Sequence, residues 1–124
     1  FAFSLGIAFQ LKDDLLDYVG YQKETGKIIG KDFEEGKLTL PLIKAFELTN
    51  KEDFIFLQDA FKARDFSKFK DVIKIVYKSG AINEVEELSK KYSSKSLNLL
   101  KKFPETIYKK ELQSIVFSLD KRIK

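Results

Sequence analysis

The stretch AFQLKDDLLDY at residues 8–18 decides how this chain is interpreted, because it combines a helical apolar pattern with a line of acidic residues. On a helix that turns about 100° per residue, four polar side chains fall within an arc of about 100°: Gln10, Asp13, Asp14 and Asp17. Nearly all the other directions carry apolar residues. Since helices of this kind are usually buried, we expect a buried helix over residues 1–18 with one polar stripe.

The acids of this stripe predict a metal site. Like charges three and four residues apart on a helix repel one another, and burial increases the cost. A divalent cation would remove that cost, and oxygen-only ligands suit magnesium or manganese. The chain has no histidine and no cysteine, which excludes zinc sites, thiol catalysis and disulfides. The alternative is that Asp13, Asp14 and Asp17 lie on a solvated face, since acidic helix faces are common.

The segment that follows has loop composition and a positive bias. Four of the six glycines lie within residues 20–36. Four lysines lie in or just after this segment: Lys23, Lys27, Lys31 and Lys37. Magnesium held by few carboxylates keeps positions open for phosphate oxygens, so a phosphorylated ligand is expected, and the last three lysines are candidate partners for it. A solvated basic loop is the alternative interpretation, because lysines usually lie on the surface.

The rest of the chain predicts an all-α fold, because apolar residues recur every three or four positions and strand signals are scarce. Pro41 suits a first helical turn, Asn50 suits an N-cap, and Gly80 and Pro104 end or break helices. The expected helices cover residues 40–49, 51–61, 66–77, 82–102 and 105–122. We interpret the twelve phenylalanines, most of them at helical spacing, as core residues.

Length and composition limit the alternatives further. The 124 residues, of which 44% are hydrophobic and 34% charged, suit one globular domain or a piece of one. The chain starts with Phe1 and has no methionine, so we expect a missing upstream segment. The apolar run of residues 1–11 is too short to span a bilayer and has no basic flank. We therefore expect no integral membrane segment, no signal peptide and a cytoplasmic location.

Nucleotide and nucleic-acid binding are not supported. The sequence contains no P-loop string, and its acids lack the alternating spacing of an EF-hand. The net charge of +4 is mild, and the lysines do not alternate with aromatic residues as in single-strand binders. We expect no nucleic-acid partner.

Residues 8–18 resemble FQxxDDxxD, the second aspartate-rich motif of the trans-polyprenyl diphosphate synthases. TGK at 25–27, GKD at 30–32 and EEGKLTLPLI at 34–43 follow in an order and spacing similar to that family. The last string is most similar to bacterial medium- and long-chain members such as octaprenyl diphosphate synthases. The specific motifs cover about residues 6–45.

This resemblance implies an all-helical isoprenoid-synthase fold, with residues 1–124 as the C-terminal half of a single polyprenyl synthetase domain. That half would contain the motif helix, a basic loop at 19–39 and helices to the C-terminus. The implied enzyme is a Mg2+-dependent prenyltransferase and a homodimer. It joins isopentenyl diphosphate to an allylic prenyl diphosphate and so makes a longer trans-polyprenyl diphosphate.

The resemblance also implies roles for individual residues. Asp13 matches the principal ligand of one magnesium ion, and Asp14 and Asp17 complete its shell directly or through water. Gln10 matches a polar residue on the substrate side.

The matching loop residues would act on the substrate. Lys27 and Lys37 match lysines that contact the allylic diphosphate, and Lys27 joins Asp13 as a catalytic residue. Asp32 matches a supporting polar residue, whereas Lys31 occupies a variable position.

The sequence lacks other parts that the family needs, including a first aspartate-rich motif and a lysine-threonine pair. This chain alone is therefore not expected to catalyse condensation and would work within a longer enzyme. A non-catalytic helical subunit or interaction module of a prenyl synthase complex is the alternative, although the intact acids count against it. A terpene cyclase fits less well, because it needs a hydroxyl residue and a glutamate where this chain has Asp17 and Tyr21.

Overall fold

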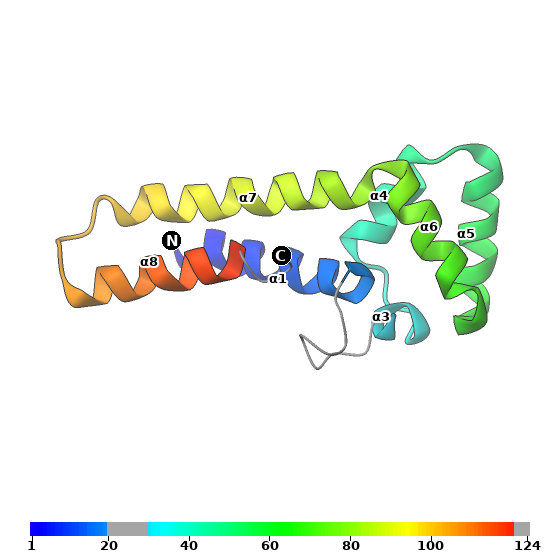
Figure 1. Ribbon diagram of the computed structural model, residues 1–124, viewed down its shortest axis with the longest axis horizontal. Helices are drawn as coiled ribbons and strands as arrows, with labels where there is room; N and C mark the ends of the chain where they lie inside the picture. Colours follow the sequence, from blue (N-terminus) through cyan, green and yellow to red (C-terminus); the bar gives the residue numbers. More distant parts are fainter. Residues whose placement is uncertain (20–29, 121–124) are drawn as a thin grey trace. The chain divides into compact units, whose positions relative to one another are not determined.

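The computed structural model describes residues 1–19 and 30–120, and within these ranges the chain is helical and contains no strand (Figure 1). This confirms the predicted all-α class. A 3-10 turn, η1 (Phe66–Lys68), precedes α6. The α-helices are α1 (Ala2–Val19), α3 (Lys31–Glu34), α4 (Leu40–Leu48), α5 (Lys51–Ala63), α6 (Phe69–Ser79), α7 (Ala81–Leu100) and α8 (Ile107–Asp120).

The chain forms two compact units, and α1 and α7 each contribute to both. The first unit comprises Phe1–Asp13 and Glu86–Lys124. Within it, α7 and α8 run antiparallel (Figure 1), and the Ser89 hydroxyl on α7 donates a hydrogen bond of 3.4 Å to the Ala8 carbonyl on α1. Its buried apolar side chains are Ala8, Leu11, Leu100, Val116 and Leu119.

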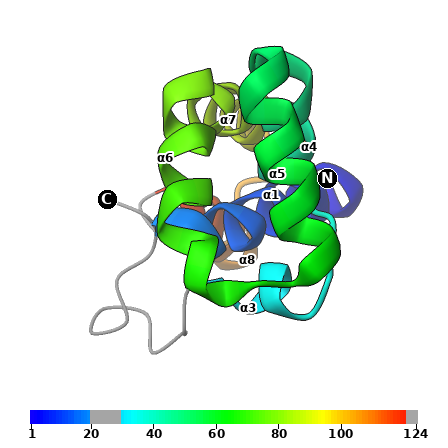
Figure 2. The same ribbon diagram turned by 90° about the vertical axis from the view of Figure 1, so that its right-hand side faces the viewer.

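The second unit, Asp14–Val85, holds most of the residues that the sequence assigns to substrate binding. Helix α6 packs against α4, α5 and η1, and α4 packs against α5; Figure 2 shows α5 and α6 beside each other. The fully buried side chains recur at helical spacing on these three helices, as expected for faces that share a core. They are Leu42, Ala45, Leu57, Ala60, Val72 and Val76.

Most predicted helix ends are confirmed within about two residues, which is the usual uncertainty of such boundaries. Pro41 lies in the first turn of α4. Gly80, with φ of 88°, ends α6. Helix α5 continues two residues past its predicted end at Phe61 and stops at Arg64, which adopts a left-handed conformation.

The prediction of a loop over residues 19–39 was partly wrong. Val19 still belongs to α1, and Lys31–Glu34 form the short helix α3. Asp32 and Phe33 of this helix are buried, so contacts with the rest of the second unit stabilise it where its glycine-rich sequence indicated a loop. Residues 20–29 lie outside the described ranges.

The first helix was also predicted to be buried throughout, and this was wrong for its N-terminal half. Phe3 and Phe9 are 77% and 52% exposed, whereas Lys12 is only 1% exposed. An apolar pattern shows which faces can be buried, but packing partners decide which faces are covered. Lys12 is among the fully buried side chains, so its ammonium group is covered together with its aliphatic stem.

The interpretation of the phenylalanines as core was likewise wrong for several of them. Phe33 and Phe69 are buried, but six others are exposed by 39% or more. Those six are Phe3, Phe9, Phe54, Phe66, Phe103 and Phe117. None of the helices within residues 1–19 and 30–120 is long and apolar enough to cross a membrane.

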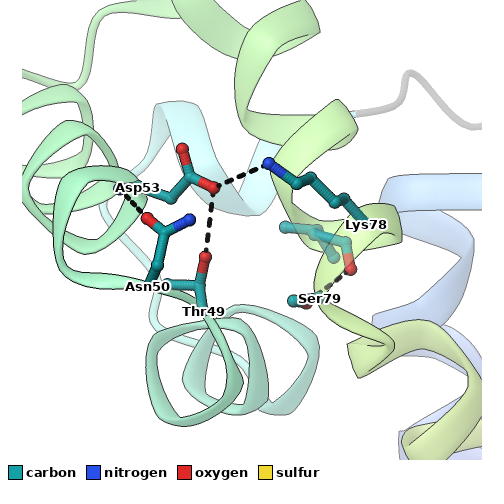
Figure 3. A network of polar contacts seen from close by, with 6 residues as sticks. Thr49, Asn50, Asp53, Lys78 and Ser79 are labelled. Carbon is teal, nitrogen blue, oxygen red and sulfur yellow. Dashed lines mark hydrogen bonds and ion pairs between the residues drawn. The ribbon is translucent and has the colours of Figure 1, made fainter.

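A polar network connects the start of α5 to the end of α6 (Figure 3). The Asn50 side chain accepts a hydrogen bond of 2.8 Å from the Asp53 backbone N–H, which caps α5 as predicted. The Asp53 carboxylate accepts from the Thr49 hydroxyl at 3.4 Å and lies 3.5 Å from the Lys78 ammonium. The Lys78 side chain is 72% exposed, so its ion pair is largely screened by water.

The helix cap should therefore matter more than the ion pair. Asn50→Ala is expected to lower the free energy of unfolding by about 1 kcal/mol, because it leaves an N–H of the first turn unpaired. Lys78→Ala should cost less than about 1 kcal/mol. Urea denaturation of both variants measures the two values, and a larger loss for Lys78→Ala would contradict this ranking.

Candidate functional site

Asp17 connects α1 to the segment that follows the undescribed residues. Its side chain is fully buried. Its carboxylate oxygens accept hydrogen bonds from the backbone N–H groups of Lys31 at 3.1 Å and Asp32 at 3.2 Å, while its carbonyl accepts from the Gly30 N–H at 2.9 Å. These amides open α3, and a carboxylate is favourable at a helix N-terminus because the free N–H groups point at it. Asp17 thus offsets part of its own burial cost while it holds α3 in place.

Helix α3 in turn positions Lys37. The Lys37 backbone N–H donates a hydrogen bond of 2.7 Å to the Asp32 carbonyl. The Lys37 ammonium lies 4.0 Å from the Asp32 carboxylate, which belongs to a side chain only 12% exposed. The Lys37 side chain is 66% exposed, so it remains accessible to a ligand. The structure therefore brings together three predicted site residues, Asp17, Asp32 and Lys37.

An aromatic cluster fixes the start of α3. Gly30 has φ of 82°, and a Cβ built there would lie 2.6 Å from the Phe66 ring and 2.7 Å from the Phe69 ring. These two rings stack with centroids 5.3 Å apart, and Phe69 also contacts Phe33 and Tyr18 at centroid distances of 5.4 and 5.8 Å. Only glycine combines this backbone conformation with so close an approach.

Asp14 and Tyr18 extend the site along α1, and both are buried. Burial raises the pKa of the Tyr18 phenol, and the carboxylates of Asp17, Asp32 and Asp14 raise this pKa further, while the Thr39 hydroxyl acts in the opposite direction. Three carboxylates therefore lie near one neutral phenol. The Tyr18 and Thr39 hydroxyls are both buried, and neither makes a hydrogen bond of good geometry within the described part of the second unit, although the two groups interact with each other.

The remaining predicted residues occupy different environments. Asp13 is half-buried and Gln10 is exposed, both on α1. Lys27 lies outside the described residues, so its predicted role in diphosphate binding is not placed. Asp13, Asp14 and Asp17 share α1, as the helical spacing predicts, but they differ in burial.

No three acidic side chains within residues 1–19 and 30–120 are gathered into a ready-made metal site. The donor chemistry nevertheless fits a magnesium-like ion, because every candidate ligand is an oxygen and such ions commonly take one or two carboxylates with water and phosphate oxygens. The buried hydroxyls of Tyr18 and Thr39 add two further oxygen atoms to this site.

Sequence reasoning missed two features of the site. The hydrogen bonds from Asp17 to α3 span fourteen and fifteen residues, and no local pattern indicates them. Phe33, Phe66 and Phe69 were interpreted only as core residues, although together with Tyr18 they form the aromatic cluster against which Gly30 packs. The only local signal was Gly30 itself, which follows Ile28 and Ile29 and precedes Lys31 and Asp32.

Comparison with known proteins assigns this arrangement to a family. The family model described as polyprenyl synthetase matches residues 1–79, which include α1, α3 and the Lys37 turn. The chain belongs to the polyprenyl synthetase family. This confirms the resemblance drawn from residues 8–18 and 25–43.

Individual members are similar over nearly the whole chain. An all-trans-nonaprenyl-diphosphate synthase from Rhodobacter capsulatus is 36% identical over 93% of the chain, and an octaprenyl diphosphate synthase from Haemophilus influenzae is 32% identical over 91%. A polyprenyl synthase structure from Caulobacter crescentus, in complex with calcium and isoprenyl diphosphate, superposes with a TM-score of 0.86 at 34% identity.

These relatives are considerably longer than the chain. The chain spans 35% of each of the two curated synthases. It covers 37% of the Caulobacter polypeptide, which in turn covers 96% of the chain. The isoprenoid-synthase helical fold is therefore confirmed for this region of a polyprenyl synthetase.

Two glycines with similar backbone conformations offer a test of the aromatic contact at Gly30. Gly80 has φ of 88°, and a Cβ added at this residue would meet no atom within 4 Å. Gly80→Ala should therefore cost only the left-handed strain, about 1–2 kcal/mol. Gly30→Ala should cost about 1–3 kcal/mol more, because its Cβ overlaps the rings of Phe66 and Phe69. Thermal denaturation of both variants measures the difference in stability. Equal losses of stability would mean that the rings of Phe66 and Phe69 can move aside at little cost.

Proposed function

We propose that this chain is the part of a trans-polyprenyl diphosphate synthase that holds the allylic prenyl diphosphate through a divalent ion, magnesium in the first instance. The single observation that carries the proposal is the Asp17 carboxylate, bonded to the amides of Lys31 and Asp32. These bonds join Asp17 to the segment that leads to Lys37, within the second unit. Membership of the polyprenyl synthetase family supports the same activity.

The proposed roles divide between the helix and the turn. Asp13, Asp14 and Asp17 hold the ion, which when bound would neutralise charge on the departing diphosphate. Asp17 also keeps α3 in place, so its role is partly structural. Gln10, exposed on the same helix, faces the substrate.

The turn supplies the positive charge. Lys37 binds diphosphate oxygens, and Asp32, 4.0 Å from its ammonium, restrains it. Lys27 is the second proposed diphosphate ligand. Preorganised cations of this kind stabilise charge that develops as the diphosphate leaves, after which isopentenyl diphosphate attacks the allylic carbon and loses a proton.

An apolar groove in the first unit suits the prenyl chain. It is lined on α1 by Ala2, Leu5, Gly6 and Phe9, and on α8 by Ile115 and Leu119 among others. Gly6, Phe9 and Asp13 follow one another at intervals of three and four residues, so they share a face of α1. A prenyl chain in this groove would direct its diphosphate toward Asp13.

The related proteins support the ligand class. The Caulobacter structure contains calcium, a divalent ion, together with isoprenyl diphosphate. Use of magnesium, assembly as a homodimer and cytoplasmic location stay predictions. A non-catalytic subunit is the competing function, and activity measurements separate the two.

The deciding test uses the full-length polypeptide that carries this sequence and measures Mg2+-dependent incorporation of isopentenyl diphosphate. Asp13→Asn should lower turnover by roughly 100-fold or more, because it removes a ligand of the ion. Asp59→Asn, at an exposed acid on α5, is the matched control and should leave turnover unchanged. An unmodified enzyme without any incorporation would favour the non-catalytic subunit.

Asp17→Asn should behave differently from Asp13→Asn. An amide can accept from only one of the two backbone N–H groups, so the variant should also lose about 1–3 kcal/mol of stability. Asp13→Asn, at a half-buried position, should retain the parent melting temperature. Equal melting temperatures for both variants would argue against the structural role of Asp17.

A bulky residue at Gly6 should shorten the product. A Cβ at Gly6 meets no atom within 4 Å, so Gly6→Leu should fold normally and fill part of the groove. The expected result is a product distribution shifted to fewer isoprene units, measured by chromatography of the dephosphorylated prenols. An unchanged distribution would place the prenyl chain elsewhere.

A further inference from the structure

Arg64 has an unusual backbone conformation next to the proposed site. It ends α5 with φ of 50° and ψ of 38°. Within residues 1–19 and 30–120, it is the only residue other than glycine with a positive φ. Its backbone N–H is directed at the carbonyls of Ala60 and Phe61. Glycine or asparagine would make the same backbone contacts with less strain, so helix capping gives no reason for an arginine.

The Arg64 guanidinium lies directly against Gly36. A Cβ at Gly36 would lie 2.6 Å from Nε and 2.8 Å from Cζ of Arg64. Gly36 has φ of 76° and its N–H donates to the Phe33 carbonyl at 3.0 Å. The absence of a side chain at residue 36 therefore lets the guanidinium reach the backbone immediately before Lys37.

The charges around this turn favour an anionic ligand. Among the described residues, the Arg64 guanidinium makes no ion pair. Lys37 has Asp32 at 4.0 Å, and the neighbouring Glu35 pairs with Lys31. Arg64 is exposed, and its guanidinium lies against the residue before Lys37, so the turn gains a second cation that an anionic ligand would attract.

We propose that Arg64 is a further binding residue for the diphosphate group and acts beside Lys37; this rests on the proposed function. A guanidinium presents paired N–H donors that match two phosphate oxygens, whereas a lysine ammonium acts as a point charge. Arg64 would thus orient the diphosphate that Lys37 attracts. The same chemistry suits two ligands, the allylic prenyl diphosphate and released inorganic pyrophosphate.

The experiment compares three substitutions in the full-length polypeptide that carries this sequence. Arg64→Gly removes the guanidinium and relieves the left-handed strain. Arg64→Asn also removes the charge, and asparagine tolerates this backbone conformation. Lys51→Asn, at an exposed lysine at the opposite end of α5, removes the same charge and is the control. The measurements are KM for the allylic diphosphate, the inhibition constant of inorganic pyrophosphate, and the melting temperature.

Both Arg64 variants should raise KM for the allylic diphosphate by about tenfold or more, with the melting temperature unchanged or higher. Lys51→Asn should change neither value. A parallel rise in the inhibition constant of pyrophosphate would assign the contact to the diphosphate group in both ligands, whereas a rise in KM alone would assign it to the prenylated ligand.

Unchanged KM and inhibition constants in both variants would overturn the proposal, as would an effect limited to isopentenyl diphosphate or an equal effect of Lys51→Asn. If these variants behave like the parent while Asp13→Asn is inactive, the proposed function stands and Arg64 has no part in it. If the parent itself is inactive, calorimetry with inorganic pyrophosphate decides: binding lost in Arg64→Gly supports the proposal, and binding retained or absent in the parent rejects it.

Discussion

The buried carboxylate of Asp17 is the constraint on which the rest of the site depends. An unpaired carboxylate in a protein interior is costly, and Asp17 offsets that cost by accepting the amides of Lys31 and Asp32. The same two bonds determine where α3 begins, and α3 determines where Lys37 emerges. One side chain therefore couples the acidic face of α1 to the basic turn, even though residues 20–29 separate them in sequence.

Sequence periodicity could predict the helices because the apolar residues that recur along them form the core. Examples are Leu42, Ala45, Val72 and Val76, all of which are buried. It could also identify Asp13, Asp14 and Asp17 as one stripe on α1. It could not predict that Asp17 caps a distant helix, because that bond depends on tertiary contacts. For the same reason α3 was missed: its four residues are too few to be helical without a packed partner.

The three aspartates of the α1 stripe look equivalent in sequence but differ in burial. Asp13 is half-buried, whereas Asp14 and Asp17 are buried. Asp13 is thus the most exposed of the three carboxylates, which suits its proposed role as a ligand of the ion, whereas the Asp17 carboxylate already accepts two backbone amides. This division agrees with a metal site that gains its remaining ligands from the substrate, and it explains why no complete cluster of acids is gathered in the described part of the chain.

Two glycines of the basic turn allow close contacts that a side chain at either position would prevent. Gly30 lets the backbone contact the rings of Phe66 and Phe69, and Gly36 lets the Arg64 guanidinium contact the backbone before Lys37. Both contacts come from the stretch that follows α5, so the end of that helix stabilises the turn from two sides. A rigid turn loses little conformational freedom when it binds an anion. Gly30 and Gly36, two of the glycines that indicated a loop in the sequence, are thus positions at which the turn is closely packed.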